Sequence, residues 1–493
     1  MRRRRSNTAE RSRGWSWSRV QRIQGKDAKA TLDRAQRDPV WWVESVLGDR
    51  LWQRQRDIIE SVRDNPETAV KSCHGPGKSF TAARVALWFL MTHRPSIVIT
   101  TAPTDRQVRG ILWKEIRAAH ARSRYPLGGT LLSQELKLDS DWWAWGFTAP
   151  DYDPDRFQGF HEVHILVIVD EAAGVSDQIF EGIDGVLTSD QSRLLMIGNP
   201  TSTTGRFADA FKTPGIAKIT ISAFDTPNFT TFGITEADIA TGAWEEKVAG
   251  QEMPFPYLVT PQWVAKRYQR WGPESQLYQA RVLGQIPTIG NDTLIPLHWI
   301  EAAVQRTLEP GTPNELGVDV ARFGSDETVI MHRRGSVARL WKAIPMGDTM
   351  ETVGQVRVAL RETGAITAKI DAVGLGAGVY DRLHELKDPV DEMQSGAAAS
   401  DPERFANTRA EWWWGLRSRF ESGDIDIEDD EELVEQLANI KYKVNSRGQI
   451  VIESKEDMKK RGRKSPDRGD ALMLAFARVE RPAGLAFGSV SRR

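Results

Sequence analysis

The sequence has little cysteine, no long apolar run and almost no charge imbalance. Its 493 residues include one cysteine, Cys73, so the chain cannot form an internal disulfide, which suits a reducing cytoplasm. No apolar run approaches the ~18 residues of a membrane span, and the N-terminus lacks the apolar segment of a signal peptide. A net charge of −1 excludes a uniformly basic DNA-coating protein, so any nucleic-acid surface must be local. A hydrophobic content of 40% and a charged content of 27% are ordinary for a globular protein.

A glycine-rich turn at residues 70–80, between a predicted strand and a predicted helix, is the feature on which the first half is built. Such a turn points successive backbone N–H groups at one spot, and the helix N-terminus adds partial positive charge, so a polyphosphate can bind there. Lys78 can reach the β- and γ-phosphates and Ser79 can ligate Mg²⁺. The motif is imperfect, because Ser72 stands where the first glycine is expected. The turn residues that we expect to contact ATP are Ser72, Cys73, His74, Gly75, Pro76, Gly77, Lys78 and Ser79.

An aliphatic strand at residues 164–169 supplies the partner of this turn. It ends in Asp170 and Glu171, at the carboxyl end where open α/β sheets bind ligands. Asp170 is predicted to hold the Mg²⁺ of ATP and Glu171 to polarise the attacking water. Asn199 follows a further strand and could sense the γ-phosphate, although a plain strand-end turn is the alternative. Gln53, beside Trp52, could bind adenine, or Trp52 could pack an amphipathic helix.

The rest of the first half carries weaker signals. Residues 1–37 form a predicted basic, flexible arm that is attracted to phosphate backbones or merely solvated. We assign residues 38–225 to a P-loop ATPase domain with a mainly parallel sheet, of the RecA/ASCE-like type. Residues 226–310, which have scattered proline and glycine and many aromatic residues, are predicted to be a lid or linker subdomain.

A second sheet follows, at residues 311–478, with residues 479–493 as a tail. Asp319 lies inside a predicted strand of a hairpin, where an unpaired charge would be costly unless it binds a metal ion. Asp371 ends another strand, and Asp467 and Asp470 lie three residues apart on one helix face. Carboxylates from two strands and a helix form the ribonuclease H-like pattern, in which two divalent ions about 3.5–4 Å apart cleave a phosphodiester. The alternatives are that Asp467 stabilises a helix N-terminus and that Asp326 shapes the hairpin turn.

Two further stretches flank these carboxylates. The helix predicted at 407–420 contains three adjacent tryptophans, which point in different directions and therefore favour core packing over base stacking. A cationic stretch just before Asp467 could meet a DNA backbone or be a solvated loop. Its members are Lys455, Lys459, Lys460, Arg461, Arg463 and Lys464.

An ATPase with Lys78, Asp170 and Glu171, joined to a nuclease with Asp319, Asp371 and Asp470, resembles the large terminase subunit of tailed bacteriophages. The resemblance covers residues from about 40 to 478. Its most specific parts are the P-loop and the segments 169–172, 198–200, 319–326 and 465–471. It implies an ATPase that drives double-stranded DNA into a procapsid, and a nuclease that cuts concatemeric DNA when packaging begins and ends. The catalytic cation that some members carry early in the P-loop could here be Lys71 or come from a neighbouring subunit.

The resemblance also implies cofactors and partners. They are ATP and Mg²⁺, with Mn²⁺ able to support the nuclease, a portal protein, a small terminase subunit and a ring of usually five copies. The expected location is the host cytoplasm, with transient docking on the procapsid, no membrane and no place in the mature virion. A repair or restriction helicase–nuclease would need a second RecA-like domain, for which residues 226–310 are too short. A non-catalytic ATP-dependent scaffold would not need aspartates inside strands, and an integrase or transposase would not need the motor.

Overall fold

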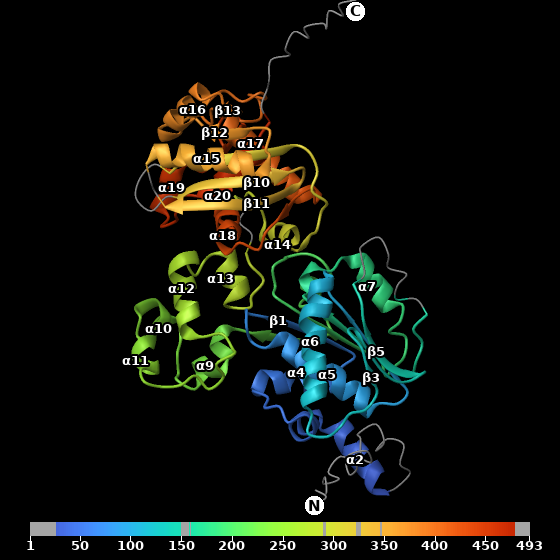
Figure 1. The fold of residues 1–493 in the computed structure, drawn as a ribbon. Helices are drawn as coiled ribbons and strands as arrows, with labels where there is room; N and C mark the ends of the chain where they lie inside the picture. The colour runs from blue at the N-terminus through green and yellow to red at the C-terminus, as the bar shows by residue number, and fades with distance from the viewer. Residues whose placement is uncertain are drawn as a thin grey trace, which may run out of the picture. The chain divides into compact units, whose positions relative to one another are not determined.

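The computed structural model describes residues 26–148, 157, 159–288, 292–321, 327–345 and 348–478 (Figure 1). The chain divides into two compact units, residues 1–288 and 289–493. The predicted segment 226–310 therefore spans the division, and the five-part division of the sequence stays a prediction. None of the helices in the described ranges is long and apolar enough to cross a membrane.

The first unit is built on an eight-stranded, mostly parallel sheet of order β3-β4-β5-β2-β6-β7-β1-β8. Strand β7 lies between β1, which leads into the glycine-rich turn, and β6, which ends in Asp170, and it pairs in parallel with both. This insertion of one strand between the two nucleotide-binding strands is the predicted ASCE arrangement. The strands are β1 (Glu67–Ser72), β2 (Ser96–Thr101), β3 (Thr130–Leu131), β4 (Glu135–Asp139), β5 (Trp142–Gly146), β6 (His164–Asp170), β7 (Arg193–Gly198) and β8 (Ala217–Ile221).

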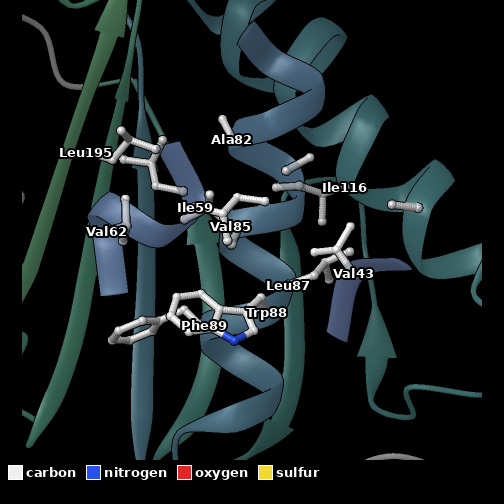
Figure 2. Close-up of a cluster of buried hydrophobic side chains, with 14 of the residues drawn as sticks. Val43, Ile59, Val62, Ala82, Val85, Leu87, Trp88, Phe89, Ile116 and Leu195 are labelled. Carbon is white, nitrogen blue, oxygen red and sulfur yellow. The ribbon is translucent and has the colours of Figure 1, made fainter. Parts of the chain in front are cut away.

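Helix α5 (Lys78–Thr92) passes through the core of this unit. From Thr81 to Thr92 every residue is buried, so the helix is apolar on all sides, as expected of an enclosed helix. Figure 2 shows Val85, Trp88 and Phe89 of α5 among side chains from α4 (Gln53–Asp64), α6 (Trp113–Arg122) and the sheet. Burial on every side fixes the helix whose first turn forms the candidate phosphate site.

The predicted N-terminal arm is shorter than expected. Residues Lys26–Arg37 form helix α2, where the sequence predicted a flexible arm as far as residue 37. The helix is held because the Trp88 indole donates to the Ala35 carbonyl and the Gln36 amide donates to the Thr92 carbonyl, at 2.8 and 2.7 Å. The basic residues 1–25 lie outside the described residues, so that part stays a prediction.

The remaining elements of the first unit are short and helical. They are α3 (Pro39–Trp42), η1 (Val43–Leu47), η2 (Arg106–Leu112), η4 (Ala172–Gly174), α7 (Asp177–Asp184), α8 (Arg206–Ala210), η5 (Ala223–Asp225), α9 (Pro227–Thr230), α10 (Glu236–Thr241), α11 (Trp244–Val248), α12 (Pro261–Trp271) and α13 (Gln276–Arg281). The helices from α9 onward have no strand among them, because segments rich in proline and glycine break any longer pattern.

The second unit has a six-stranded sheet of order β13-β12-β9-β10-β11-β14. Three consecutive strands, β9, β10 and β11, form an antiparallel meander, and β12 and β13 then extend the sheet in parallel beside β9. This is the predicted ribonuclease H-like order. The strands are β9 (Asn314–Asp319), β10 (Glu327–Arg334), β11 (Val337–Pro345), β12 (Ala368–Asp371), β13 (Val390–Met393) and β14 (Asp426–Ile427), with a separate hairpin of β15 (Tyr442–Val444) and β16 (Ile450–Ile452).

The two faces of this sheet have different chemistry. Leu316, Val318 and Ile370 pack on one face against α15 (Thr349–Thr363) and α16 (Leu375–Glu385). Alternate residues point to opposite faces of a strand, and the other face carries α20 (Asp467–Phe476), packed on β9, β10 and β12. Around them are α14 (Leu297–Gln305), α17 (Thr408–Ser422), α18 (Glu431–Asn439) and α19 (Lys455–Lys460). The aspartates of β9 and β12 therefore meet the helix that carries Asp467 and Asp470.

Candidate functional site

The glycine-rich turn has the backbone that a phosphate-binding loop needs. Gly77 precedes the first residue of α5 at φ 89°, and Gly75 has φ 69°. Residues with a Cβ rarely adopt these angles, so glycine at both positions lets the chain turn from β1 into α5. The turn therefore runs directly into the N-terminus of α5, an enclosed helix of 15 residues.

Lys78 and Ser79 meet the predicted acidic and amide residues at the carboxyl ends of the neighbouring strands. The Lys78 ammonium donates to Asn199 Oδ1 at 2.8 Å and lies 3.6 Å from Glu171 Oε1. The Ser79 hydroxyl donates to Asp170 Oδ2 at 3.0 Å. Polar residues that are remote in sequence thus converge at the start of α5, as the sequence predicted.

Asn199 connects three parts of this site. Its side-chain amide donates to the Ser72 carbonyl at 2.7 Å, its carbonyl oxygen accepts from Lys78, and its backbone N–H lies 3.4 Å from Glu171 Oε2. Gly198 makes the approach possible, because a Cβ there would lie 3.0 Å from the Ala172 nitrogen. Asn199 therefore connects the end of β1, Lys78 and Glu171, and its role as a phosphate sensor stays a prediction.

Burial alters the acidity of two groups in this site. The pKa of Asp170 is raised to about 6 by burial and by the neighbouring Glu171 carboxylate, against the lowering effect of Lys78 and Ser79. Burial also raises the pKa of the Cys73 thiol to about 12, so the single cysteine stays a neutral thiol at neutral pH. A cation brought to Asp170 would offset the repulsion from Glu171.

The structure directs attention from Gln53 to Gln55. Gln53 is exposed and donates to Asp57 on its own helix, whereas Gln55 is buried with its Nε2 atom against Gly77. Gln55 Nε2 makes no hydrogen bond within the described structure. Trp52 is buried, and its indole donates to the Pro76 carbonyl at 3.3 Å, so this ring holds the backbone of the glycine-rich turn. The only sequence feature that pointed to Gln55 is its position in the first turn of α4.

The first residues of the loop are tied to other parts of the unit. The N–H of Cys73 donates to Ile221, that of His74 donates to Arg281, and the Gly75 carbonyl accepts from Val259, at 2.8, 2.8 and 3.0 Å. These N–H groups are engaged, unlike the phosphate-facing donors that the sequence predicted for Cys73 and His74. The Lys71 ammonium lies over the ring of Phe211, 5.0 Å from its centroid. In the described structure its contact is thus with this ring and not with the side chains that surround Lys78.

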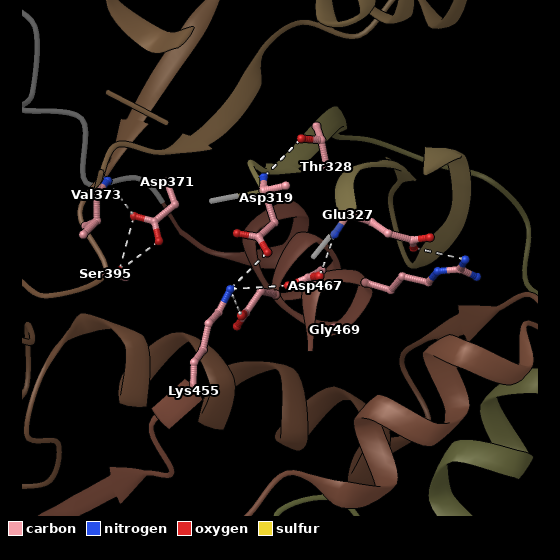
Figure 3. A network of polar contacts seen from close by, with 12 residues as sticks. Asp319, Glu327, Thr328, Asp371, Val373, Ser395, Lys455, Asp467 and Gly469 are labelled. Atoms are coloured by element: carbon pink, nitrogen blue, oxygen red, sulfur yellow. Dashed lines mark hydrogen bonds and ion pairs between the residues drawn. The ribbon is translucent and has the colours of Figure 1, made fainter. Parts of the chain in front are cut away.

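The second unit contains a cavity of about 260 Å³ lined by all four predicted metal-binding aspartates. Asp319 ends β9, Asp371 ends β12, and Asp467 and Asp470 lie in the first turn of α20. Figure 3 shows Asp319 and Asp467 turned toward the same central side chain, that of Lys455. The topology thus gathers side chains from two strands and a helix that are far apart in sequence, as the ribonuclease H-like pattern predicts.

Lys455 occupies the centre of the cluster. Its ammonium lies 3.2 Å from Asp319 Oδ2, 3.1 Å from Asp470 Oδ2 and 3.6 Å from Asp467 Oδ1. The three carboxylates are 5–8% exposed, and Lys455 is 37% exposed. Within the described residues, no three histidine, cysteine or acidic groups are spaced to hold a metal ion as they stand. The Lys455 ammonium lies where three of the carboxylates converge.

Three of the four carboxylates, those of Asp371, Asp467 and Asp470, are also held from outside the cluster. The Ser395 hydroxyl lies 3.0 Å from Asp371 Oδ2, and the Glu327 N–H donates to Asp467 Oδ2 at 2.9 Å. Asp470 Oδ1 accepts from the Trp413 indole at 3.1 Å and from Arg409 at 3.3 Å. Of the three tryptophans predicted to pack in the core, Trp413 is buried and Trp412 and Trp414 are half-buried, and the Trp413 indole N–H also reaches Asp470. Ser395 and Arg409 had no recognisable sequence signal.

The carboxylates differ in acidity. Burial, together with Asp470 and Asp467, raises the pKa of Asp319 to about 8, although Lys455 opposes this. Burial likewise raises the pKa of Asp371. For Asp470, burial is outweighed by Lys455 and Arg409, which lower its pKa. A set of buried oxygens that repel one another and already hold an ammonium is the chemistry of a cation site.

The predicted cationic DNA-binding stretch is organised differently from the expectation. Lys455 is among the carboxylates and not facing outward, while Lys460 pairs with Asp457 at 2.9 Å and Arg461 with Glu453 at 2.6 Å. Alternating charges along α19 therefore neutralise part of the stretch. Residues 322–326, including Asp326 and most of the predicted hairpin turn, lie outside the described residues.

Comparison with known proteins supports the resemblance that the sequence suggested. No protein-family model matches the chain. The "probable terminase, large subunit" of Enterobacteria phage P7 is 28% identical over 459 residues, which cover 86% of this chain and 87% of that protein. The chain is therefore similar to a phage large terminase subunit over most of its length. The predicted resemblance is therefore confirmed across most of the sequence.

Solved structures of the same description are also similar. The large terminase of a thermophilic bacteriophage, in complex with ADP, is 11% identical and covers 87% of this chain and 98% of that one, with a TM-score of 0.40. The HK97 bacteriophage large terminase is 13% identical and covers 90% and 99%, with a TM-score of 0.36. The nuclease domain of the large terminase subunit gp2 of bacterial virus Sf6 is 22% identical and covers 37% and 98%, with a TM-score of 0.34. At these TM-scores, the fold rests on the strand order and register described above.

Proposed function

We propose that this chain is the large subunit of a phage terminase, an ATPase that moves double-stranded DNA into a procapsid and a metal-dependent endonuclease that cuts concatemeric DNA. One observation carries the proposal. A single chain holds a phosphate loop with its acidic and amide partners in one unit, and four convergent aspartates in the other. The similarity to the probable large terminase subunit of phage P7 covers most of both chains and supports the proposal.

The first site has a residue for each part of ATP hydrolysis. Lys78 binds the β- and γ-phosphates, Ser79 and Asp170 hold the Mg²⁺ that accompanies ATP, and Glu171 orients the attacking water. Asn199, bonded to both Lys78 and the Ser72 carbonyl, changes partners when the γ-phosphate leaves. Gln55 replaces Gln53 as the adenine-binding amide, since its buried Nε2 is without a hydrogen bond in the described structure.

The second site has the donors for divalent ions. Asp319, Asp371 and Asp470 are the proposed ligands, with Asp467 as a further one, and bound Mg²⁺ or Mn²⁺ would activate water and stabilise the leaving oxygen of the phosphodiester. Lys455 keeps the carboxylates together by charge until ions bind. Ser395, Arg409 and Trp413 orient the oxygens of Asp371 and Asp470.

The finer parts of the proposal follow from the terminase description. The motor acts as a ring, usually of five copies, on a portal protein, and a small terminase subunit selects the DNA. The ring works in the host cytoplasm, docks transiently on the procapsid and is absent from the mature virion. The catalytic cation of the motor comes from a neighbouring subunit, because Lys71 lies over Phe211.

Two variants test the proposal. Lys78→Ala should abolish ATP hydrolysis and leave nicking of plasmid DNA with Mn²⁺ intact, and Asp371→Ala should do the reverse. Lys212→Ala and Asp381→Asn, exposed residues outside both sites, are the matched controls and should keep both activities. A wild-type protein that hydrolyses ATP but cuts no DNA with either metal would replace the proposal with an ATP-dependent translocase that only binds DNA.

A further inference from the structure

The first unit carries an uncompensated basic surface on η2 and α6 that neither proposed active site uses. Arg106, Arg109 and Lys114 are exposed, and we call these three residues the cationic face. Across the described ranges they form no ion pair and no hydrogen bond. Some other exposed cations do have an acidic partner, as Lys212 has Asp209 and Arg382 has Glu385.

In the described structure, the carboxylates nearest in sequence form no ion pair with the cationic face. Asp105 accepts a hydrogen bond from the Gln134 amide at 3.2 Å. Glu115 pairs with the buried Arg84 at 3.1 Å, so its charge is directed inward to α5. Arg117 and Arg122 extend the basic character along α6 and donate only to backbone carbonyls, those of Ser133 and Ala118.

The opposite side of the same stretch is anchored in the core. Val108, Leu112 and Trp113 are fully buried in the cluster that encloses α5. The Trp113 indole donates to Thr100 Oγ1 at 2.8 Å and ties the start of α6 to the end of β2. The cationic face is therefore held on a rigid support, although its side chains are exposed.

The support lies beside the nucleotide site. Strand β2 pairs with β6 up to Thr101 and Val169, the residue before Asp170. Segment η2 begins at the same carboxyl edge of the sheet and packs on both α5 and β6. It has π-helical geometry, which is rare and frequently found at functional sites. A ligand on the cationic face would thus lie against the elements that bind ATP.

We propose that Arg106, Arg109 and Lys114 bind the phosphate backbone of double-stranded DNA and are the contact through which the motor holds its substrate. The inference rests on the proposed function, which supplies a polyanion that this unit must hold. Two guanidinium groups and one ammonium match phosphate oxygens, and a backbone contact without base recognition suits a motor that must move along any sequence.

The first test measures affinity for a 30-base-pair duplex across a NaCl series in EDTA, which keeps the nuclease inactive. The triple variant Arg106→Gln/Arg109→Gln/Lys114→Gln should bind at least tenfold more weakly at moderate salt. The slope of its plot of log K against log [salt] should be smaller in magnitude by about 2–3, since each lost phosphate contact removes about 0.9 from the slope. Basal ATP hydrolysis should stay unchanged, because the variant touches no residue of the ATP site.

Two control variants separate contact from net charge and from folding. Arg54→Gln/Lys212→Gln/Arg382→Gln removes the same charge from exposed cations that have acidic partners, and should retain wild-type binding. Arg106→Lys/Arg109→Lys/Lys114→Arg should also bind within about threefold of wild type. A Gln triple with wild-type affinity and slope would overturn the inference, as would an equal loss in the charge-matched control.

The second test uses the single cysteine of the chain. Cys73 is buried, so a cysteine introduced by Arg109→Cys can be labelled selectively with a photo-crosslinker, with Arg382→Cys as the control. DNA crosslinked at position 109 and not at 382 supports the inference, whereas no DNA crosslink at 109 overturns it and leaves an acidic protein as the partner. If wild type neither hydrolyses ATP nor binds DNA, the proposed function fails first; equal behaviour of an active wild type and the Gln triple rejects this surface alone.

Discussion

The Lys369 ammonium lies 2.7 Å from Glu315 Oε2, and both side chains are enclosed beneath the last turn of α20. Lys369 also donates to the carbonyls of Ala477 and Ala475, at 2.7 and 3.3 Å, which caps the carboxyl end of that helix. Lys369 precedes Asp371 by two positions on β12, and Glu315 precedes Asp319 by four on β9. The strands that supply two of the four aspartates therefore also anchor the far end of the helix that supplies the others.

Replacing Lys369 by Met should disorder the nuclease site from a distance. Removing one partner of a buried ion pair should lower the unfolding free energy of the second unit by about 3 kcal/mol. Glu315 and the Ala475 carbonyl keep Arg333 as a partner, but both lose Lys369, and the Ala477 carbonyl loses the Lys369 donor. Nicking with Mn²⁺ should fall at least tenfold while ATP hydrolysis persists. Urea denaturation and both assays on the full chain measure this, with Arg361→Met, an exposed α15 substitution, as the control. Unchanged nicking in a destabilised Lys369→Met would show that the anchor is structural only.

Gly317→Ala should separate α20 from the sheet. A Cβ at Gly317 would lie 2.2 Å from the Ala471 carbonyl oxygen and 2.4 Å from the Ala475 nitrogen, so the helix must shift. Overpacking of this kind lowers the unfolding free energy by roughly 1–3 kcal/mol. Nicking should fall further than this loss of stability alone would explain, since Asp467 and Asp470 move with the helix. The matched control is Gly354→Ala in α15, where a Cβ meets nothing within 4 Å; it should be neutral or slightly stabilising. Normal nicking by Gly317→Ala would contradict the tight α20–β9 contact.

Lys455→Met should increase metal binding while impairing the metal-free protein. The ammonium lies among Asp319, Asp467 and Asp470, and a divalent ion must displace it to reach those oxygens. We expect the Mn²⁺ concentration at half-maximal thermal stabilisation to fall about tenfold. The melting temperature in EDTA should drop, because the three carboxylates lose the ammonium that offsets their mutual repulsion, although Asp470 keeps Arg409. Lys459→Met, on the same helix, is the control. An unchanged Mn²⁺ midpoint would indicate that ions bind away from Lys455.

His93 should make the first unit sensitive to acid. Burial lowers its pKa to about 4, and the nearby His164 and Arg193 act in the same direction, while the Phe89 carbonyl opposes them. Because the pKa of His93 is lower in the folded chain than in the unfolded chain, protonation of His93 favours unfolding. The stability of the folded state is therefore unaffected above about pH 6.5 and decreases as the pH falls toward 4. The loss is at most about 3 kcal/mol. His93→Gln should flatten the stability profile between pH 6.5 and 4 in chemical denaturation. An equally steep profile in the variant would assign the acid sensitivity to other groups.

The sequence by itself determined both architectures and which side chains converge at the two candidate sites. The phosphate turn, the aliphatic strand before Asp170 and Glu171, and the aspartates at strand ends are local patterns, and each places its side chain at a known edge of a sheet. The register that joins β1, β7 and β6 then brings Lys78, Asn199 and Asp170 together without further information. Local sequence patterns were sufficient to locate these residues because the direction of a strand determines the sheet edge at which the following residue lies.

Only the tertiary structure decided which neighbours complete the sites. Gln55, and not the predicted Gln53, lies against the phosphate turn. Lys455 points inward from a stretch that was predicted to be basic and exposed, and residues 26–37 form a helix where a flexible arm was predicted. In each case the deciding contact comes from a distant segment: Gly77 for Gln55, the β9 and α20 aspartates for Lys455, and α5 for the N-terminal helix. A linear pattern gives the type of a side chain and its local direction, whereas its partner depends on packing between elements far apart in sequence, and that packing sets burial, charge and hydrogen bonding.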